Sequence, residues 1–177
     1  MSQITWNIDH AHSTIGFKVK HMMFTNVKGQ FEEYTATAIT KNEDDLTDAS
    51  LHFEAKSASI NTDNKDRDNH LKSADFFDVE KYPTLKFEST AITKKTGNDY
   101  EVQGNLTIKD VTKSIKFNAE YSGKLTDPWG NTKSGLILDG SINRKDFGLN
   151  WNSALETGGV LVGDQVKFDI EVQFIKQ

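Results

Sequence analysis

The sequence contains no cysteine and only two prolines in 177 residues. The absence of thiols excludes disulfides, cysteine nucleophiles and cysteine-ligated metal sites. The chain is also too polar to contain a membrane-spanning helix. Its first ten residues, MSQITWNIDH, lack the basic start and apolar run of a signal peptide. We therefore expect a cytoplasmic protein without a transmembrane segment.

The composition is that of a folded globular chain. Hydrophobic residues make up 36% of it and charged residues 27%, and its 11 phenylalanines are too many for a disordered segment. The length fits one domain spanning residues 1–177. The net charge is -5 and the lysines are scattered among acidic residues, so nucleic acid is not an expected partner.

Apolar and polar residues alternate through most of the chain, which predicts half-buried strands. In one such stretch Ile15, Phe17, Val19 and His21 share a face, so His21 should point inward. We expect a turn at 26–29, and the change of phase between Phe31 and Tyr34 predicts a β-bulge. Further alternating stretches lie at 4–8, 51–55, 85–91, 100–108, 115–121, 136–142 and 166–174.

These eight or nine strands are joined by short turns, which implies antiparallel order in either a closed barrel or a sandwich. Closing a sheet requires strands that bend at defined positions. The phase changes near Tyr34 and Ala58, together with glycines within strands at positions 16, 104 and 140, favour the barrel. A barrel of about eight strands is either filled by side chains or holds one slim ligand.

One segment, RDNHLKSADFFDVEKYP at residues 67–83, interrupts the strand pattern. We expect a short helix that begins near Ala74, is capped by Ser73 and carries Asp75 and Asp78 near its start. The neighbouring Phe76 and Phe77 then suit a cap over one end of the barrel. The alternative is a surface loop anchored by these two phenylalanines.

The sequence offers little for catalysis. His10 and His12, with Asp9, could ligate a metal only if another ligand came from elsewhere in the chain, and a hydrogen-bonded structural role for His12 is the preferred interpretation. No nucleophile elbow, zinc-protease helix, phosphate-binding loop or dinucleotide fingerprint is found. We therefore expect neither an enzyme nor a cofactor or metal site.

Inward-facing phenylalanines are abundant, and they could either fill a solid core or line an apolar tunnel. A tunnel would bind an apolar chain with roughly 0.8 kcal/mol for each buried methylene, so that about fifteen carbons could give micromolar affinity after ordering costs.

Five segments together resemble the YceI-like, polyisoprenoid-binding proteins. They are WNIDHAHSTIGFKVKH (6–21), RDNHLKSADFFDVEKYP (67–83), GNLTIKDVTK (104–113), INRKDFGL (142–149) and LVGDQVKFDIEV (161–172). Each is short, but they occur in the family's order and span nearly the whole chain. Asp110 stands where the family has glycine, at a turn position where we expect a positive φ.

The resemblance implies an all-β, eight-stranded antiparallel, lipocalin-like barrel with a short helical insert capping one end. It implies binding without turnover of a long-chain isoprenoid lipid, either a polyprenyl compound or an isoprenoid quinone. Fatty acids or fatty amides are an alternative ligand class, and a metal-dependent enzyme using the N-terminal histidines is another. Several family members look like dimers, so a homodimer is also considered. Many carry a signal sequence, which this chain lacks.

On this hypothesis the lipid lies lengthwise in the pore and its polar head stays near the mouth. Polar contacts at the mouth are expected from His21, Arg67 and Arg144. The residues expected to line the pore are Phe17, Val19, Phe31, Phe53, Phe76, Phe77, Leu85, Phe87, Leu106, Phe117, Leu138, Phe168 and Ile170.

Overall fold

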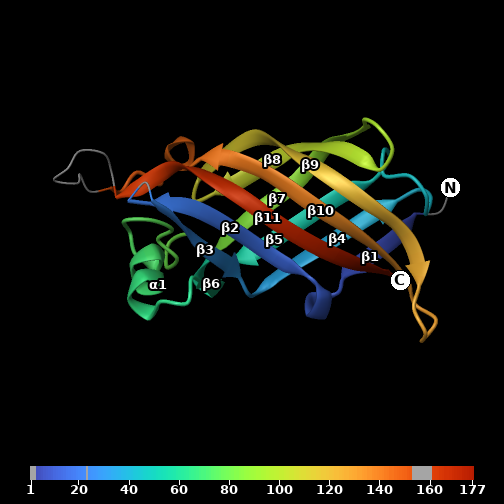
Figure 1. Ribbon diagram of the computed structural model, residues 1–177, viewed down its shortest axis with the longest axis horizontal. Coiled ribbons are helices and arrows are strands. Elements are labelled where there is room, and N and C mark those ends of the chain that lie inside the picture. The colour runs from blue at the N-terminus through green and yellow to red at the C-terminus, as the bar shows by residue number, and fades with distance from the viewer. Residues whose placement is uncertain (1–2, 23, 153–160) are drawn as a thin grey trace.

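The computed structural model describes residues 3–22, 24–152 and 161–177, and its strands form one antiparallel sheet that closes on itself (Figure 1). One α-helix, α1 (Lys65–Lys72), and three 3-10 turns, η1 (His10–His12), η2 (Ser57–Ser59) and η3 (Arg144–Phe147), accompany it. The strand segments are β1 (Ile4–Ile8), β2 (Thr14–His21), β3 (Thr25–Phe31), β4 (Tyr34–Thr40), β5 (Ser50–Lys56), β6 (Ile60–Asn61), β7 (Thr84–Lys94), β8 (Asp99–Ile108), β9 (Val111–Thr126), β10 (Thr132–Asn143) and β11 (Val162–Lys176).

The eleven segments make an eight-stranded barrel because three of its strands are broken. β1 resumes as β2 after η1, β3 resumes as β4, and β5 resumes as β6 after η2. The first broken strand pairs with the second through β1 with β4 and β2 with β3. The second pairs with the third through β4 with β5 and β3 with β6. β11 closes the ring by pairing with β2 through its first part and with β1 through its last. The predicted eight-stranded antiparallel barrel is confirmed.

Two local predictions about turns were wrong. Residues 26–29 belong to β3, which pairs with β2 from His21↔Thr25 to Ile15↔Phe31, and the phase change before Tyr34 marks the boundary between β3 and β4. At the turn after β8, the left-handed conformation is adopted by Lys109, at φ 59°, and not by Asp110. The turn between β8 and β9 is present as expected, and only the residue with positive φ differs. At 26–29 the turn-forming residue types were misleading, because the pairing of β3 with β2 places the reversal before Thr25.

The helical insert is present, but the helix lies earlier than expected. The Asn64 side chain caps α1 by accepting a hydrogen bond from the Arg67 amide at 2.9 Å, and Asp66 and Asp68 favour the first turn. Ser73 ends the helix, and its hydroxyl donates to the His70 carbonyl at 2.6 Å. Phe76 and Phe77 therefore follow α1 in a series of turns.

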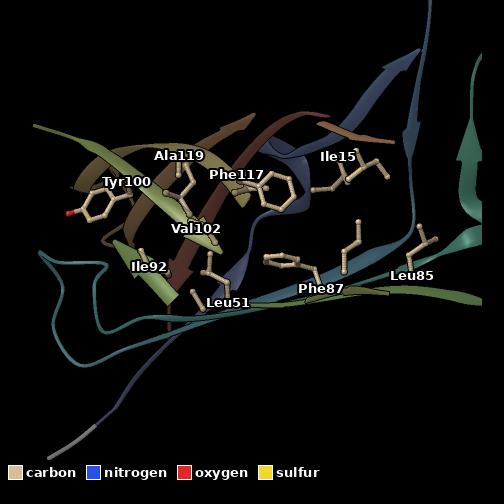
Figure 2. Packing of buried hydrophobic residues seen from close by; sticks show 14 of the residues in the cluster. Ile15, Leu51, Leu85, Phe87, Ile92, Tyr100, Val102, Phe117 and Ala119 are labelled. Atoms are coloured by element: carbon tan, nitrogen blue, oxygen red, sulfur yellow. The ribbon is translucent and has the colours of Figure 1, made fainter. Parts of the chain in front are cut away.

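The two ends of the barrel differ in how they are filled. At the end remote from α1, large side chains such as Trp6, Tyr100 and Tyr121 are buried, and Trp6 donates a hydrogen bond through Nε1 to Thr40 Oγ1 at 2.9 Å. Toward the middle, Phe87 and Phe117 face each other edge to face with ring centroids 5.2 Å apart (Figure 2). Gly104 makes room for this pair, because a Cβ there would lie 2.5 Å from Phe87 Cζ. Open space remains toward α1.

Candidate ligand-binding site

An inner cavity of about 130 Å³ occupies the middle of the barrel. Its walls come from all round the ring, from β2 through β11, because inward-facing residues recur at every second position of each strand. Phenylalanine, leucine, isoleucine, valine and alanine dominate these walls. His52 also borders the cavity, but its side chain is 51% exposed and lies 3.8 Å from Glu88. The inner cavity therefore suits a purely apolar chain.

An outer cavity of about 400 Å³ lies at the end of the barrel that carries α1. The helix residues His70 and Leu71 and the following Phe76 and Phe77 cover it, so the 67–83 segment is a cap and not merely a surface loop. This volume falls within the range of about 300–1,000 Å³ that is typical of sites for small ligands. The cap thus encloses a site of useful size.

The two cavities adjoin, because several residues line both. Phe17 and Phe31 pack with centroids 5.7 Å apart at this junction, and Phe31 meets Phe77 of the cap edge to face at 6.0 Å. These rings join the floor of the outer cavity to the wall of the inner one. The shared residues are Phe17, Phe31, Leu85, Ile108 and Phe168.

Each residue expected to line a pore lies on a wall of one or both cavities. Phe53, Phe87, Leu106, Phe117, Leu138 and Ile170 line the inner cavity, and Val19, Phe76 and Phe77 line the outer one. Phe17, Phe31, Leu85 and Phe168 line both. Their contact with a lipid stays a prediction.

The three expected mouth residues, His21, Arg67 and Arg144, all line the outer cavity. Arg67 reaches it from α1 and donates to Thr62, through Nε to Oγ1 at 2.8 Å and through Nη2 to the carbonyl at 2.7 Å. These bonds fix its guanidinium at the side of the cavity. Lys20 and Asp66 add one further charge of each sign, so among the described residues of this lining cationic groups outnumber anionic ones.

Arg144 has a structural task that the sequence did not reveal. It is only 2% exposed, and it donates hydrogen bonds to the carbonyls of Leu149, Trp151 and Gly163 at 2.6, 2.9 and 2.8 Å. Burial lowers the pKa of its guanidinium, while Asp164, 4.0 Å away, acts in the opposite direction. Arg144 therefore ties Leu149 and Trp151 to Gly163 at the rim of the cavity.

An aromatic cluster at the cap was missed by the sequence reasoning. Trp151 meets His70 edge to face at 4.6 Å and lies 5.5 Å from Phe76, and His70 Nε2 lies 2.8 Å from Asp75 Oδ2. Trp151 lies outside any alternating stretch, so strand periodicity gave no sign that it faces the cavity. The cluster fastens the cap to the segment held by Arg144.

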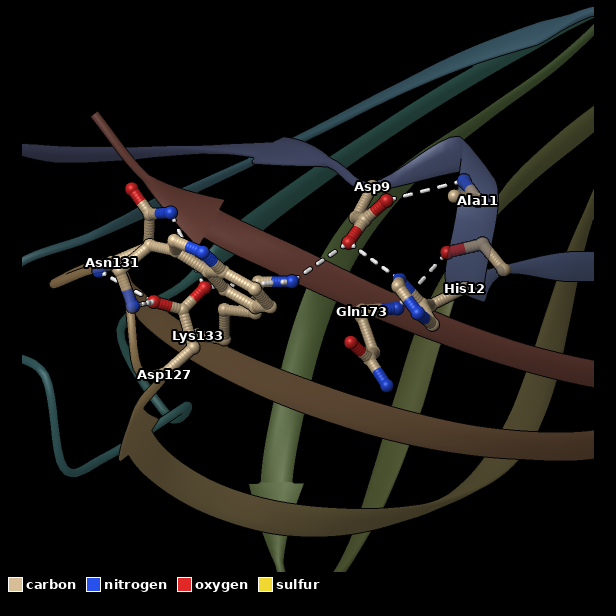
Figure 3. Close-up of polar contacts among 9 residues, drawn as sticks. Asp9, Ala11, His12, Asp127, Asn131, Lys133 and Gln173 are labelled. Atoms are coloured by element: carbon tan, nitrogen blue, oxygen red, sulfur yellow. Dashed lines mark hydrogen bonds and ion pairs between the residues drawn. The ribbon is translucent and has the colours of Figure 1, made fainter.

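The N-terminal histidines make contacts with neighbouring side chains around η1, and Figure 3 shows those of His12. Asp9 Oδ2 lies 2.9 Å from His12 Nδ1 and accepts a hydrogen bond from Lys133 Nζ, also at 2.9 Å. The bond from Lys133 is the main reason why the pKa of Asp9 falls from 3.8 to about 2. His10 packs on the ring of Tyr34 at 4.9 Å. This network ties η1 to β10 at the base of the β9–β10 hairpin.

Within residues 3–22, 24–152 and 161–177, no three His, Cys, Asp or Glu side chains are grouped so that they could hold a metal ion. No helix in these same ranges has the length and apolar character needed to span a membrane.

Comparisons with known proteins agree with this architecture. A UPF0312 protein from Staphylococcus epidermidis strain RP62A is 41% identical over 170 residues, which cover 96% of each chain. The crystal structure of a YceI protein from Campylobacter jejuni has a TM-score of 0.76 at 33% identity, covering 89% of this chain and 90% of that one. A polyisoprenoid binding domain from Saccharophagus degradans shares the fold, with a TM-score of 0.65 at 13% identity over 97% of this chain and 98% of that one.

The family model described as the YceI-like domain matches residues 6–174. The match includes both cavities, the cap and every strand that lines them. On this evidence the chain belongs to the YceI-like family.

Proposed function

We propose that the barrel binds and carries a long-chain isoprenoid lipid, a polyprenyl compound or an isoprenoid quinone, without chemical turnover. The observation that carries this proposal is the continuity of an apolar inner cavity with an outer cavity whose lining includes Arg67, Arg144 and His21. This change from an apolar lining to one with charged side chains fits an amphiphile, with its tail in the barrel and its polar head under the cap. The similarity in fold to the polyisoprenoid binding domain from Saccharophagus degradans supports the same ligand class.

The energetics favour a long tail. Each buried methylene contributes roughly 0.8 kcal/mol, so a tail of about fifteen carbons offsets the cost of ordering the ligand and reaches micromolar affinity. The aromatic rings at the junction of the cavities pack well against a branched, unsaturated chain. Binding of this kind requires no cofactor or metal ion.

A fatty acid or fatty amide is the second candidate ligand. The guanidinium groups of Arg67 and Arg144 at the outer cavity favour it, because arginine binds carboxylate and carbonyl oxygens through several donors. Most of the N–H donors of Arg144 already form hydrogen bonds with backbone carbonyls, so Arg67 is the better partner for such a head group.

The decisive experiment is native mass spectrometry of protein purified without detergent, followed by solvent extraction and identification of the released molecule. One isoprenoid species per chain is the expected result, and the same spectrum reports whether the protein is a homodimer. A fatty acid or amide at one per chain would establish the second candidate. Protein that is empty and also takes up no added isoprenoid or fatty acid would disprove both.

A further inference from the structure

Three lysines form a row across the outer face of the barrel. Lys28 on β3 lies opposite Lys18 on β2, and Lys18 lies opposite Lys167 on β11. Phe17 and Phe168, the next residues on β2 and β11, line the cavities, so the alternation of side chains places these lysines outside. Like charges directly opposite one another destabilise a sheet. The row therefore costs stability in the isolated protein.

Within the described residues, no ion pair neutralises the charge of this row. In the part of the chain that the structure describes, neither these lysines nor the neighbouring Lys20 has a carboxylate within 4.0 Å of its ammonium nitrogen. On β11, Asp169 and Glu171 lie opposite Gly16 and Thr14, farther from the tip of the β2–β3 hairpin. Asp164 lies nearer the tip, but its carboxylate is 3.4 Å from Lys145 Nζ. Residues 10–31 contain no Asp or Glu, although the whole chain has a net charge of -5.

The tip of the same hairpin is apolar and exposed. Met22 and Phe24 are 38% and 83% exposed. The residues beside the tip, His21 and Val27, line the outer cavity, and the Met22 amide donates a hydrogen bond at 2.8 Å to the carbonyl of Leu161, another lining residue. The apolar tip therefore stands at the rim of the cavity, at the α1 end of the barrel.

We propose that the β2–β3 hairpin docks on the surface of an anionic lipid bilayer. Phe24 and Met22 enter the boundary between head groups and acyl chains, and the lysine row of Lys18, Lys28 and Lys167 faces the anionic head groups. This inference rests on the proposed function, because docking there would let an apolar ligand pass between the bilayer and the outer cavity without crossing water. A nucleic acid would be complementary in charge to the lysines, but its binding would not explain an apolar tip beside a lipid-sized cavity.

The dimensions are compatible with this arrangement. Lys18 lies four residues before Met22, about 13 Å along the strand. A tip that enters the interface by about 5–10 Å brings the row to within about one Debye length of the head groups, which is about 8–10 Å at physiological salt. In Figure 1, β3, β2 and β11 lie side by side on the face toward the viewer, so the tip and the row belong to one surface.

The test is co-sedimentation of the protein with phosphatidylcholine vesicles, with and without phosphatidylglycerol, at low and high salt. The two informative variants are Phe24→Ser and the triple variant Lys18→Gln, Lys28→Gln, Lys167→Gln. The matched controls are Trp129→Ser, which removes an equally exposed ring (83%) at the far end of the barrel, and a triple variant of exposed lysines at that end. That control triple variant is Lys41→Gln, Lys94→Gln, Lys95→Gln.

We expect the wild type to bind the anionic vesicles and to be released by high salt. The triple variant of the row should weaken binding on the order of a hundredfold, and Phe24→Ser at least about tenfold, while both controls bind like the wild type. The proposal is overturned if the wild type does not bind anionic vesicles at low salt, or if the control variants lose as much vesicle binding as the two informative variants. It is also overturned if the protein binds single-stranded DNA more tightly than vesicles.

This readout does not require a bound ligand, so the two proposals can fail separately. Protein that is empty and takes up no lipid but still binds anionic vesicles through the row and tip would disprove the proposed function and support docking. Protein that carries lipid but does not sediment with vesicles would support the proposed function and overturn docking.

Discussion

Phe17 and Gly29 face each other across β2 and β3, and the Phe17 ring occupies the space that a side chain at position 29 would need. A Cβ built on Gly29 would lie 2.5 Å from Phe17 Cζ and 2.8 Å from Thr62 Cγ2. Because Phe17 lines both cavities, the missing side chain at position 29 helps to position the ring at their junction.

Gly29→Ala should lower the free energy of unfolding by about 1–3 kcal/mol, since the added methyl group overpacks the junction. It should also weaken lipid binding by displacing the ring of Phe17. Urea denaturation and ligand titration measure the two effects. Combining Gly29→Ala with Phe17→Leu should recover part of the lost stability, because the shorter side chain leaves room. Additive losses would show that the two residues do not compete for space.

Phe87→Asp should weaken lipid binding by at least tenfold, because a carboxylate on the wall of the inner cavity must lose its hydration when an apolar tail enters. Phe87 is only 7% exposed, so Phe168→Ser, at a half-buried position lining both cavities, provides a milder second variant. Trp129→Asp, on the outside of the barrel, should bind like the wild type. Wild-type affinity in folded Phe87→Asp would remove this residue from the site.

Asp9→Asn should destabilise the protein at pH 7 by about 1–2 kcal/mol, since the pKa of Asp9 in the folded protein is about 2 against an ordinary value of 3.8. Its side chain and that of Lys133 are 13% and 21% exposed, so solvent screens the pair only in part. A pKa depressed by folding means that the stabilisation is complete above about pH 5 and is lost as the pH falls toward 2.

The measurement is urea unfolding of wild type and Asp9→Asn at a series of pH values. The difference in unfolding free energy between them should shrink steadily from pH 5 to pH 2. Asp48→Asn, at an exposed position, is the control and should show no such trend. A difference that stays constant across this range would mean that Asp9 acts through its shape and not its charge.

Arg144→Lys should lower the melting temperature. An ammonium group cannot reproduce hydrogen bonds that a guanidinium makes to three or more carbonyls in different directions. The loss should be about 2–4 kcal/mol, because hydrogen bonds from a charged donor are worth about 1.5–3 kcal/mol each and the lysine keeps some of them. Lys145→Arg, next in sequence and exposed, should have little effect.

Much of the barrel was predictable from local pattern. The alternation at Ile15, Phe17 and Val19 predicted both a strand and its inward face, because successive side chains point to opposite sides of a sheet. The same rule placed Phe53, Phe87 and the other lining candidates on strands inside, whereas Phe76 and Phe77 were assigned to the cap. Alternation alone could not separate a filled core from a cavity, since it gives direction and not the distance to the opposite wall.

The helix and the turns were less predictable because several residues nearby could play each role. Asn64 and Ser73 are both good capping residues, and only the packing of the segment on the barrel selected Asn64 as the start of α1 and Ser73 as its end. In the same way, Asn26 and Gly29 are common in turns, but the pairing of β3 with β2 made them part of a strand.

By itself the sequence determined a cysteine-free, antiparallel β-barrel of the YceI-like family with an apolar interior, because composition, periodicity and short motifs are local properties of a chain. Only the tertiary structure decided that the interior is hollow toward α1 and filled by Trp6, Tyr100 and Tyr121 at the other end. Only the tertiary structure also brought Trp151 to the cap, paired Lys18 with Lys28 and Lys167, and joined Asp9 to Lys133. The contacts of Lys18 with Lys167 and of Asp9 with Lys133 depend on closure of the sheet, which brings residues far apart in the chain together.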